Sequence, residues 1–211
     1  MKKSIVGLGC LGAIVLALLV GALVAGGIYN SLVRKSHEVD KSWAQVQNVY
    51  QRRADLVPNL VATVSGAANF EKSTLTQITD ARASVGQIKV DPNRAPADPN
   101  QLEAFQKAQD QLGSALSRLL VVVERYPDLK ATANFRDLQA QLEGTENRIT
   151  VERQRFNEAV QAYNTTTRTF PNVLLAGVFG FQPKPYFSAT AGAASPPKVE
   201  FNFDQPKTGA K

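Results

Sequence analysis

The stretch YQRRADLVPNLVATV, from Tyr50 to Val64, decides the fold, because it places two arginines, an aspartate and a proline inside an apolar helical pattern. Around it, apolar residues recur at alternating spacings of four and three, with Arg53 filling the position between Tyr50 and Val57. Such spacing describes one buried stripe on a helix. We therefore predict a long helix with a charged residue in its buried seam; the apolar members are Val39, Trp43, Val46, Tyr50, Val57, Leu60 and Val64.

Three more segments of the chain repeat this period. The stripe of residues 102–126 has one polar member, Gln109, and the stripe of residues 138–170 includes Thr145, Glu152 and Thr166. A shorter stripe covers residues 75–88, and breaks containing Gly, Asn or Pro separate the four segments. Short connections favour antiparallel neighbours. The fold class is therefore all-α, an up-and-down four-helix bundle, with long helices at about 30–66, 70–89, 99–126 and 132–169.

The first 29 residues predict a transmembrane anchor. No charged residue occurs between Ser4 and Ile28, and a helix of this length rises about 37 Å, enough to cross a hydrocarbon core of about 30 Å. A signal peptide has a shorter apolar region, although the small residues 25–27 offer a cleavage site. A short basic start before a long apolar segment resembles a signal anchor. We expect a single-pass protein of the cell membrane with its bundle outside the cytoplasm.

Composition limits the chemistry of the chain. Cys10 and His37 are the single cysteine and the single histidine, which excludes an intramolecular disulfide and a thiolate metal cluster. We expect neither a metal nor another cofactor. The net charge of +6 is spread over helix faces rather than gathered in a patch, so we expect no nucleic-acid partner. Basic residues on both sides of the anchor suit contact with the anionic headgroups of a membrane lipid bilayer.

The chain changes character after the predicted fourth helix. The segment FPNVLLAGVFGF, residues 170–181, is apolar and too short to span a bilayer. It ends the bundle domain of residues 30–181, close to the membrane, and its large side chains have two sites for burial, as a cap on the bundle or in the lipid interface. Residues 182–211, rich in Pro, Ala and Gly, predict a disordered tail with a strand-like end. The apolar side chains in question are Val173, Leu174, Leu175, Val178, Phe179 and Phe181.

The arginine pair raises a structural question. If the fourth helix descends beside the first, Asn147 lies level with Arg53, each about 35 Å from the base. We predict that Arg53 pairs with Glu146 or Glu143 and also satisfies the carbonyl of Ala54, which lacks its helical donor because of the following proline. The alternative is that both arginines extend to water. The full polar cluster is Arg52, Arg53, Asp55, Pro58, Asn59, Glu143, Glu146, Asn147 and Arg148.

Several stretches carry a specific combination of motifs: IYNSLVRKSHEVDKSWAQVQNVYQRRADLVPNLVATVSG, ENRITVERQRFNEAVQAYN, FPNVLLAGVFGFQPKPYF and PKVEF. They resemble the LemA family of bacterial proteins from the anchor nearly to the C terminus. The resemblance implies a membrane-anchored bundle of four helices with no established enzymatic activity. Related sequences typically carry a small residue at the position of Glu152. Some genomes encode the family beside a membrane zinc protease, so the resemblance suggests a membrane protease as one partner.

These observations favour a scaffold or adaptor that binds other envelope proteins. The sequence shows no catalytic constellation, so we do not expect an enzyme. Two alternatives stay open. Glycines in the anchor permit close helix approach, which would suit a self-assembling homo-oligomer, and Asp55 and Glu146 would be the paired acids of a hydrolase.

Overall fold

The computed structural model describes residues 2–67 and 70–188, with side chains from residue 12 onward. The described residues form helices and no strand, which confirms the all-α class. The expected strand-like end, Val199 to Phe203, lies outside the described residues, as does the whole chain from residue 189. The helices are α1 (Lys2–Ser65), α2 (Lys72–Gln87), α3 (Pro99–Val123), α4 (Pro127–Ala131), α5 (Ala133–Arg168) and α6 (Asn172–Val178).

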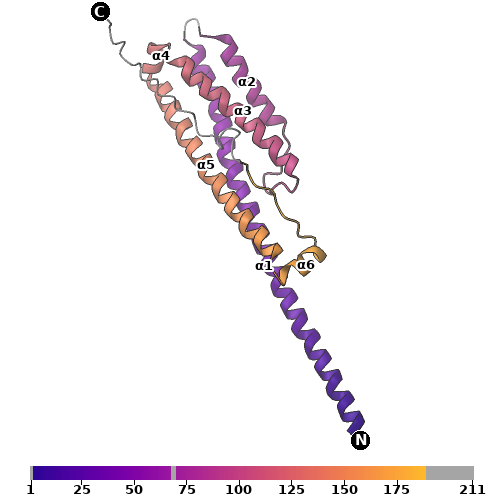
Figure 1. The fold of residues 1–211 in the computed structure, drawn as a ribbon. Helices are drawn as coiled ribbons and strands as arrows, with labels where there is room; N and C mark the ends of the chain where they lie inside the picture. Colours follow the sequence, from indigo (N-terminus) through magenta and orange to yellow (C-terminus); the bar gives the residue numbers. More distant parts are fainter. Residues whose placement is uncertain (1, 68–69, 189–211) are drawn as a thin grey trace, which may run out of the picture.

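Helix α1 continues from the apolar N-terminal segment into the bundle without a break. It has 64 residues, which corresponds to a length of about 96 Å. Within the described chain it is the one helix long and apolar enough to cross a membrane. Figure 1 shows its first part standing clear of the other helices and its second part inside the bundle. The orientation of the bundle is therefore tied to that of the apolar segment.

The bundle is built on the antiparallel pair of α1 and α5. The shorter helices α2 and α3 pack on each other and lie beside the half of this pair that is distant from the apolar segment (Figure 1). Side chains cap two of the long helices: Asp98 accepts a hydrogen bond from the Asn100 amide before α3, and Thr132 accepts one from the Phe135 amide before α5. The sequence did not predict the two short helices, α4 at the distal end and α6 at the base.

The interior is divided into two apolar clusters along the bundle axis. The distal cluster includes Val57 of α1 and Leu112 of α3. The proximal cluster is centred on Trp43, whose ring contacts Phe105 at a centroid distance of 5.2 Å and Phe156 at 5.7 Å. Between the two clusters, the seam positions of the helices carry polar side chains.

Residues 182–188, which we call the strap, pack on the bundle, so the start of the flexible tail that we placed at residue 182 is wrong. The Asn164 amide donates to the carbonyl of Lys184 and accepts from its backbone amide, both at 2.9 Å. Asn157 pairs in the same way with Phe187, at 3.1 Å and 2.9 Å. Phe187 is buried in the proximal cluster. The strap thus covers a part of α5 that α2 and α3 leave open.

The spacing of these contacts has a geometric reason. Asn157 and Asn164 are seven residues apart, so they lie on one face of α5 about 10.5 Å apart along its axis. Their partners, Lys184 and Phe187, are three residues apart, and three extended residues span about 10 Å. Each side-chain amide therefore replaces the backbone partner that a strand neighbour would supply.

Candidate functional site

A polar layer crosses the middle of the bundle. Its centre is Arg53 of α1, which is only 3% exposed. One terminal nitrogen donates to Oε1 of Glu146 on α5 at 2.9 Å. The other donates to Gln109 on α3, to the backbone oxygen at 2.8 Å and to the side-chain oxygen at 2.6 Å. The guanidinium therefore bonds with two other long helices at one height.

The surroundings of the guanidinium favour its charge. Its carbon lies 5.1 Å from the centroid of the Tyr50 ring, within the range of a cation–π contact. Burial raises the pKa of the Tyr50 hydroxyl, while the charges of Arg153 and Arg53 act in the opposite direction. Gly113 leaves room on the α3 side, because a Cβ atom there would lie 3.3 Å from Nη1 of Arg53. A buried cation with ionic, amide and aromatic partners specifies which residues of the three helices face one another.

One detail of the expected cluster is wrong, the donor to the Ala54 carbonyl, and of the two expected partners of Arg53 it is Glu146 that forms the pair. The carbonyl of Ala54 accepts a hydrogen bond from Nε of Arg82 on α2 at 3.1 Å, and Arg53 does not take it. Glu143 accepts from Gln139 of its own helix at 2.9 Å and is not the partner of Arg53. The physical reason is helix rotation. Arg53 points along the seam toward α3 and α5, whereas the Ala54 carbonyl lies on the side of α1 that α2 reaches.

The other members of the cluster lie on the surface. Asp55 accepts from Gln51 one turn earlier, at 2.7 Å, and therefore does not join the buried layer. Arg52 extends to water as the alternative had it, but Arg53 does not. The remaining exposed members are Pro58, Asn59, Asn147 and Arg148.

The two acids of the hydrolase alternative belong to different surroundings. Glu146 lines a hollow of about 400 Å³ between α3 and α5, and Asp55 is not among its lining residues. Across residues 2–67 and 70–188, no group of three or more His, Cys, Asp or Glu side chains is placed to hold a metal ion. The geometry therefore offers no support for paired-acid chemistry.

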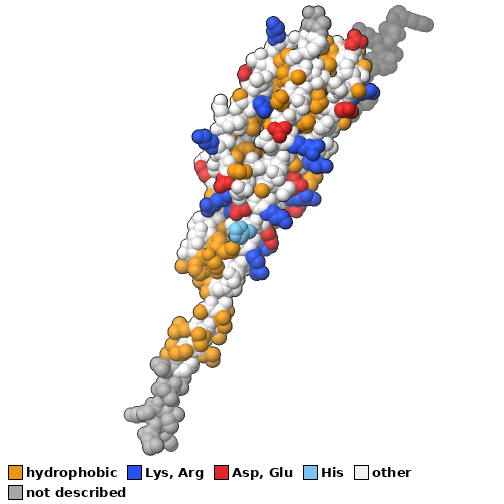
Figure 2. Space-filling model, turned by 180° about the vertical axis from the view of Figure 1, so that it is seen from behind, with side chains coloured by type: hydrophobic (Ala, Val, Ile, Leu, Met, Phe, Trp, Pro, Cys, Tyr) orange, Lys and Arg blue, Asp and Glu red, His pale blue; other side chains and the backbone are white. Residues whose placement is uncertain are grey.

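The base of the bundle carries a second distinct surface. Helix α6 turns Ala176 inward, where it is buried, and leaves Val173, Leu174 and Val178 exposed. The ring of Tyr29, at the end of the apolar segment of α1, contacts Phe179 at 5.1 Å and Phe181 at 5.8 Å. Figure 2 shows hydrophobic side chains gathered at the narrow end of the bundle, next to α1. One side of α6 caps the bundle while the other side faces outward.

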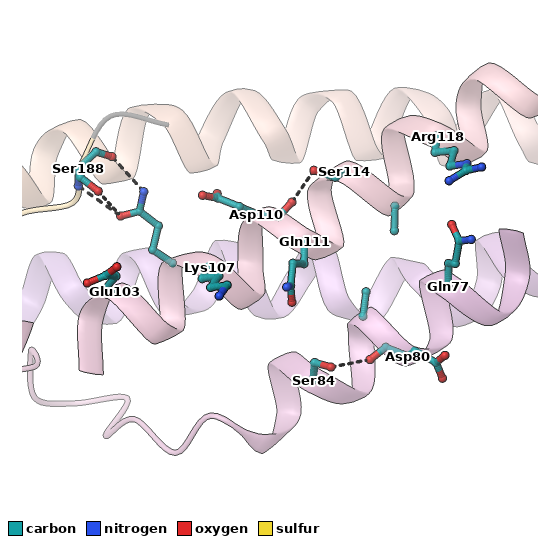
Figure 3. Close-up of a pocket in the computed structure, with 13 residues that line it drawn as sticks. Gln77, Asp80, Ser84, Glu103, Lys107, Asp110, Gln111, Ser114, Arg118 and Ser188 are labelled. Atoms are coloured by element: carbon teal, nitrogen blue, oxygen red, sulfur yellow. Dashed lines mark hydrogen bonds between the residues drawn. The ribbon is translucent and has the colours of Figure 1, made fainter. Parts of the chain in front are cut away.

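A third surface is the groove between α2 and α3, with a volume of about 810 Å³. Figure 3 shows polar side chains from both helices along it, with Gln77 and Arg118 extending toward each other at one end. At the other end, Gln106 bonds to Ser188 of the strap, donating to its carbonyl at 3.0 Å and accepting from its amide at 3.2 Å. Within the described chain, the side chains of four groove residues on α3 form no hydrogen bond or ion pair: Glu103, Lys107, Gln111 and Arg118.

Sequence reasoning missed several side chains that hold these surfaces in place. The amides of Asn157, Asn164 and Gln106 position the strap, and Arg82 satisfies the carbonyl opposite Pro58. The signal for the first two was their seven-residue spacing on one face of the predicted fourth helix, next to aromatic seam residues. No comparable signal identified Arg82.

Comparisons with known proteins identify the family of the chain. A profile described as the LemA family matches residues 42–201. Magnetosome protein MamQ 2 of Paramagnetospirillum magneticum is 26% identical over 187 residues, covering 80% of this chain and 67% of that protein. MamQ of Magnetospirillum gryphiswaldense is 26% identical over 183 residues with the same coverage. Protein LemA of Metamycoplasma hominis is 26% identical over 144 residues, or 68% of this chain and 61% of that protein.

The chain thus spans about two thirds of the length of these relatives. The family profile covers most of the bundle and continues past the base segment and the strap. The chain belongs to the LemA family.

Proposed function

We propose that this chain is a single-pass membrane protein whose bundle is a scaffold or adaptor, binding a helix of another envelope protein in the groove between α2 and α3. The observation that carries the proposal is a row of side chains on α3 that faces the groove. The row has spacings of four, four, three and four residues, which is the pattern of a helix face directed at another helix. Its members are Glu103, Lys107, Gln111, Ser114 and Arg118.

The groove has the chemistry of a polar recognition surface. On α2, Gln77, Asp80 and Ser84 stand at spacings of three and four opposite this row. The groove therefore presents acidic, basic and amide side chains. A binding partner would complement them with side chains of opposite charge and with matching hydrogen-bond donors and acceptors. A helix with a mixed polar face fits this surface better than an apolar one.

The membrane part of the proposal rests on α1. Its apolar segment is mostly exposed, with Leu23 at 77%, and it continues directly into the bundle. Membership of the LemA family and relatives named for the magnetosome support a membrane-associated role. A short basic start before a long apolar segment resembles a signal anchor, which supports a bundle outside the cytoplasm. A protease-protection assay on spheroplasts tests this side, and a bundle shielded inside intact spheroplasts would contradict it.

Photo-crosslinking inside the membrane tests the groove. A photoreactive residue at Gln111 should form a discrete product with another protein, whereas the same residue at Gln161, an equally exposed glutamine on α5, should not. Lys107→Glu should weaken that product without changing thermal stability, because Lys107 has no partner within the described chain. A product made only of two copies of this chain would instead favour self-assembly.

A further inference from the structure

The outward face of α6 is apolar, although it lies on the surface of the protein. The helix NVLLAGV contains no charged residue. Leu174 and Val178, one turn apart, are 63% and 78% exposed, and Phe170 just before the helix is 75% exposed. A surface helix ordinarily presents polar side chains to water. A cluster of exposed apolar residues rimmed by polar ones marks a contact surface.

Capping the bundle does not account for this face. The residue of α6 that the bundle buries is Ala176, on the side opposite Leu174. The chain after α6 turns back at Gly180, whose φ of 75° suits glycine, and then rises as the strap. The strap leaves the outer face of α6 uncovered.

The position of α6 identifies what covers it. Tyr29 follows directly on the apolar segment of α1, so it marks the height at which a membrane-crossing helix would leave the hydrocarbon core. Its ring contacts Phe179, the residue next to α6, at 5.1 Å. Tyrosine is enriched at this depth of a bilayer. In Figure 2 the hydrophobic side chains at the narrow end adjoin the apolar helix, with basic side chains beside them and most charged side chains farther up the bundle.

We propose that the outer face of α6 inserts into the interfacial layer of the phospholipid bilayer that α1 crosses. The chain would then contact one leaflet twice, through its spanning helix and through α6. Exposed Arg34 and Arg168 stand near this end of the bundle, where they would meet phosphate headgroups. This inference rests on the proposed membrane anchoring, because α6 reaches lipid only if α1 spans the bilayer.

Spin labels on the full-length chain test the insertion. In a Cys10→Ser background, single cysteines are placed by Val178→Cys in α6, Leu23→Cys in the apolar segment and Val121→Cys in α3. These positions are 78%, 77% and 71% exposed, so differences in accessibility report the surroundings rather than burial in the protein. The labelled protein is reconstituted into phosphatidylcholine–phosphatidylglycerol vesicles. Collisions are measured with oxygen, which concentrates in hydrocarbon, and with a water-soluble nickel complex.

We expect the label at Leu23 to be accessible to oxygen and protected from nickel, and the label at Val121 to show the reverse. At Val178, nickel accessibility should be lower than at Val121 by at least about fivefold, since an inserted side chain leaves bulk water. Adding Leu174→Ser to the Val178→Cys chain should raise nickel accessibility again while the helical circular dichroism stays unchanged.

Three results would overturn the inference. If the Val178 label is as accessible to nickel as the Val121 label while Leu23 is protected, α6 lies in water and only the anchoring stands. If the Leu23 label is also accessible to nickel, the anchoring fails and the insertion fails with it. If the Val178 label is protected from nickel but its spectrum is broadened by the label of a neighbouring copy, even at a low protein-to-lipid ratio, another copy of the chain covers α6 instead of lipid.

Discussion

Replacing Gly113 by alanine tests the geometry of the polar layer. In a helix interior, glycine is less favourable than alanine by about 0.8–1.0 kcal/mol, so the substitution should ordinarily stabilise α3. Here the new methyl group would lie 3.3 Å from Nη1 of Arg53. The guanidinium cannot move away without lengthening its bond of 2.9 Å to Glu146 or its bonds of 2.6 and 2.8 Å to Gln109.

The expected magnitude follows from these two effects. A hydrogen bond to a charged group contributes about 1.5–3 kcal/mol, so a partial loss offsets the whole gain in helix propensity. We expect the free energy of unfolding of Gly113→Ala to be lower than that of the wild type by up to about 1 kcal/mol. For a domain of this size, that corresponds to a fall in Tm of about 2–4 °C.

Gly144 provides the matched control. It lies in the interior of α5, and apart from the adjoining backbone of its own helix no atom is found within 4 Å of the position that its Cβ would take. Gly144→Ala should therefore raise the free energy of unfolding by about 0.8 kcal/mol. In an Arg53→Leu background the obstacle is gone, so Gly113→Ala should become stabilising, with a coupling energy of about 1 kcal/mol or more between the two sites.

Urea unfolding of the full-length protein in detergent micelles, followed by circular dichroism, measures these free energies. If Gly113→Ala stabilises the chain with Arg53 intact as much as Gly144→Ala does, the guanidinium does not lie between α1, α3 and α5 as described. An Arg53→Leu chain that shows no coupling with Gly113 would lead to the same conclusion.

Three further predictions concern the polar layer and the strap. Glu146→Gln should lower the free energy of unfolding by about 1 kcal/mol, less than for a fully buried pair, because the Glu146 side chain is 43% exposed; an unchanged urea midpoint would contradict this. Asn164→Ala should speed proteolysis of the strap near Phe187, because Lys184 loses two backbone hydrogen bonds; Gln161→Ala is the control, and equal cleavage rates would contradict the role of the amide. Stability should fall as pH rises above about 10, the ordinary pKa of tyrosine, since the folded state retains a proton on buried Tyr50 that the unfolded state loses; Tyr50→Phe should reduce this fall, and an unchanged alkaline melting curve would refute the assignment.

The long helices could be predicted from sequence because each buries one face along its whole length. The stripes on α1, α3 and α5 show this period directly. The stripe on α5 has the additional polar members Glu152 and Thr166, and at the height of the polar layer each stripe carries one polar residue: Arg53, Gln109 and Thr145. All three are buried. Helix length alone brings these interruptions to one height in an antiparallel bundle. The register of Arg53 opposite Glu146 was therefore within reach of sequence reasoning.

The partner of the Ala54 carbonyl was not within reach, because it depends on rotation of α2 about its own axis. Arg82 is exposed, and nothing in the pattern shows which neighbour an exposed arginine meets. The prediction of disorder for the strap was wrong for another reason. Its sequence, QPKPYFS, is rich in proline, and composition indicates disorder when few apolar side chains can be buried. Here order comes from side-chain amides on α5 and α3 that pair with the backbone of the strap.

The polar layer and the base of the bundle are connected through the register of α1 and α5. Tyr29 and Arg53 are 24 residues apart, as are Glu146 and Phe170, and either interval corresponds to a rise of about 36 Å. The contact between Arg53 and Glu146 therefore brings Phe170 and α6 to the level of Tyr29. A slip of α5 by one heptad would keep apolar stripe against apolar stripe, yet it would move α6 by about 10.5 Å along the axis and separate Phe179 from Tyr29. It would also bring Gln139 or Arg153 to the place of Glu146, so the buried guanidinium of Arg53 would lose its carboxylate partner, an error that a buried charge opposes. The charged residue in the middle of the stripe thus sets the height at which the base of the bundle stands.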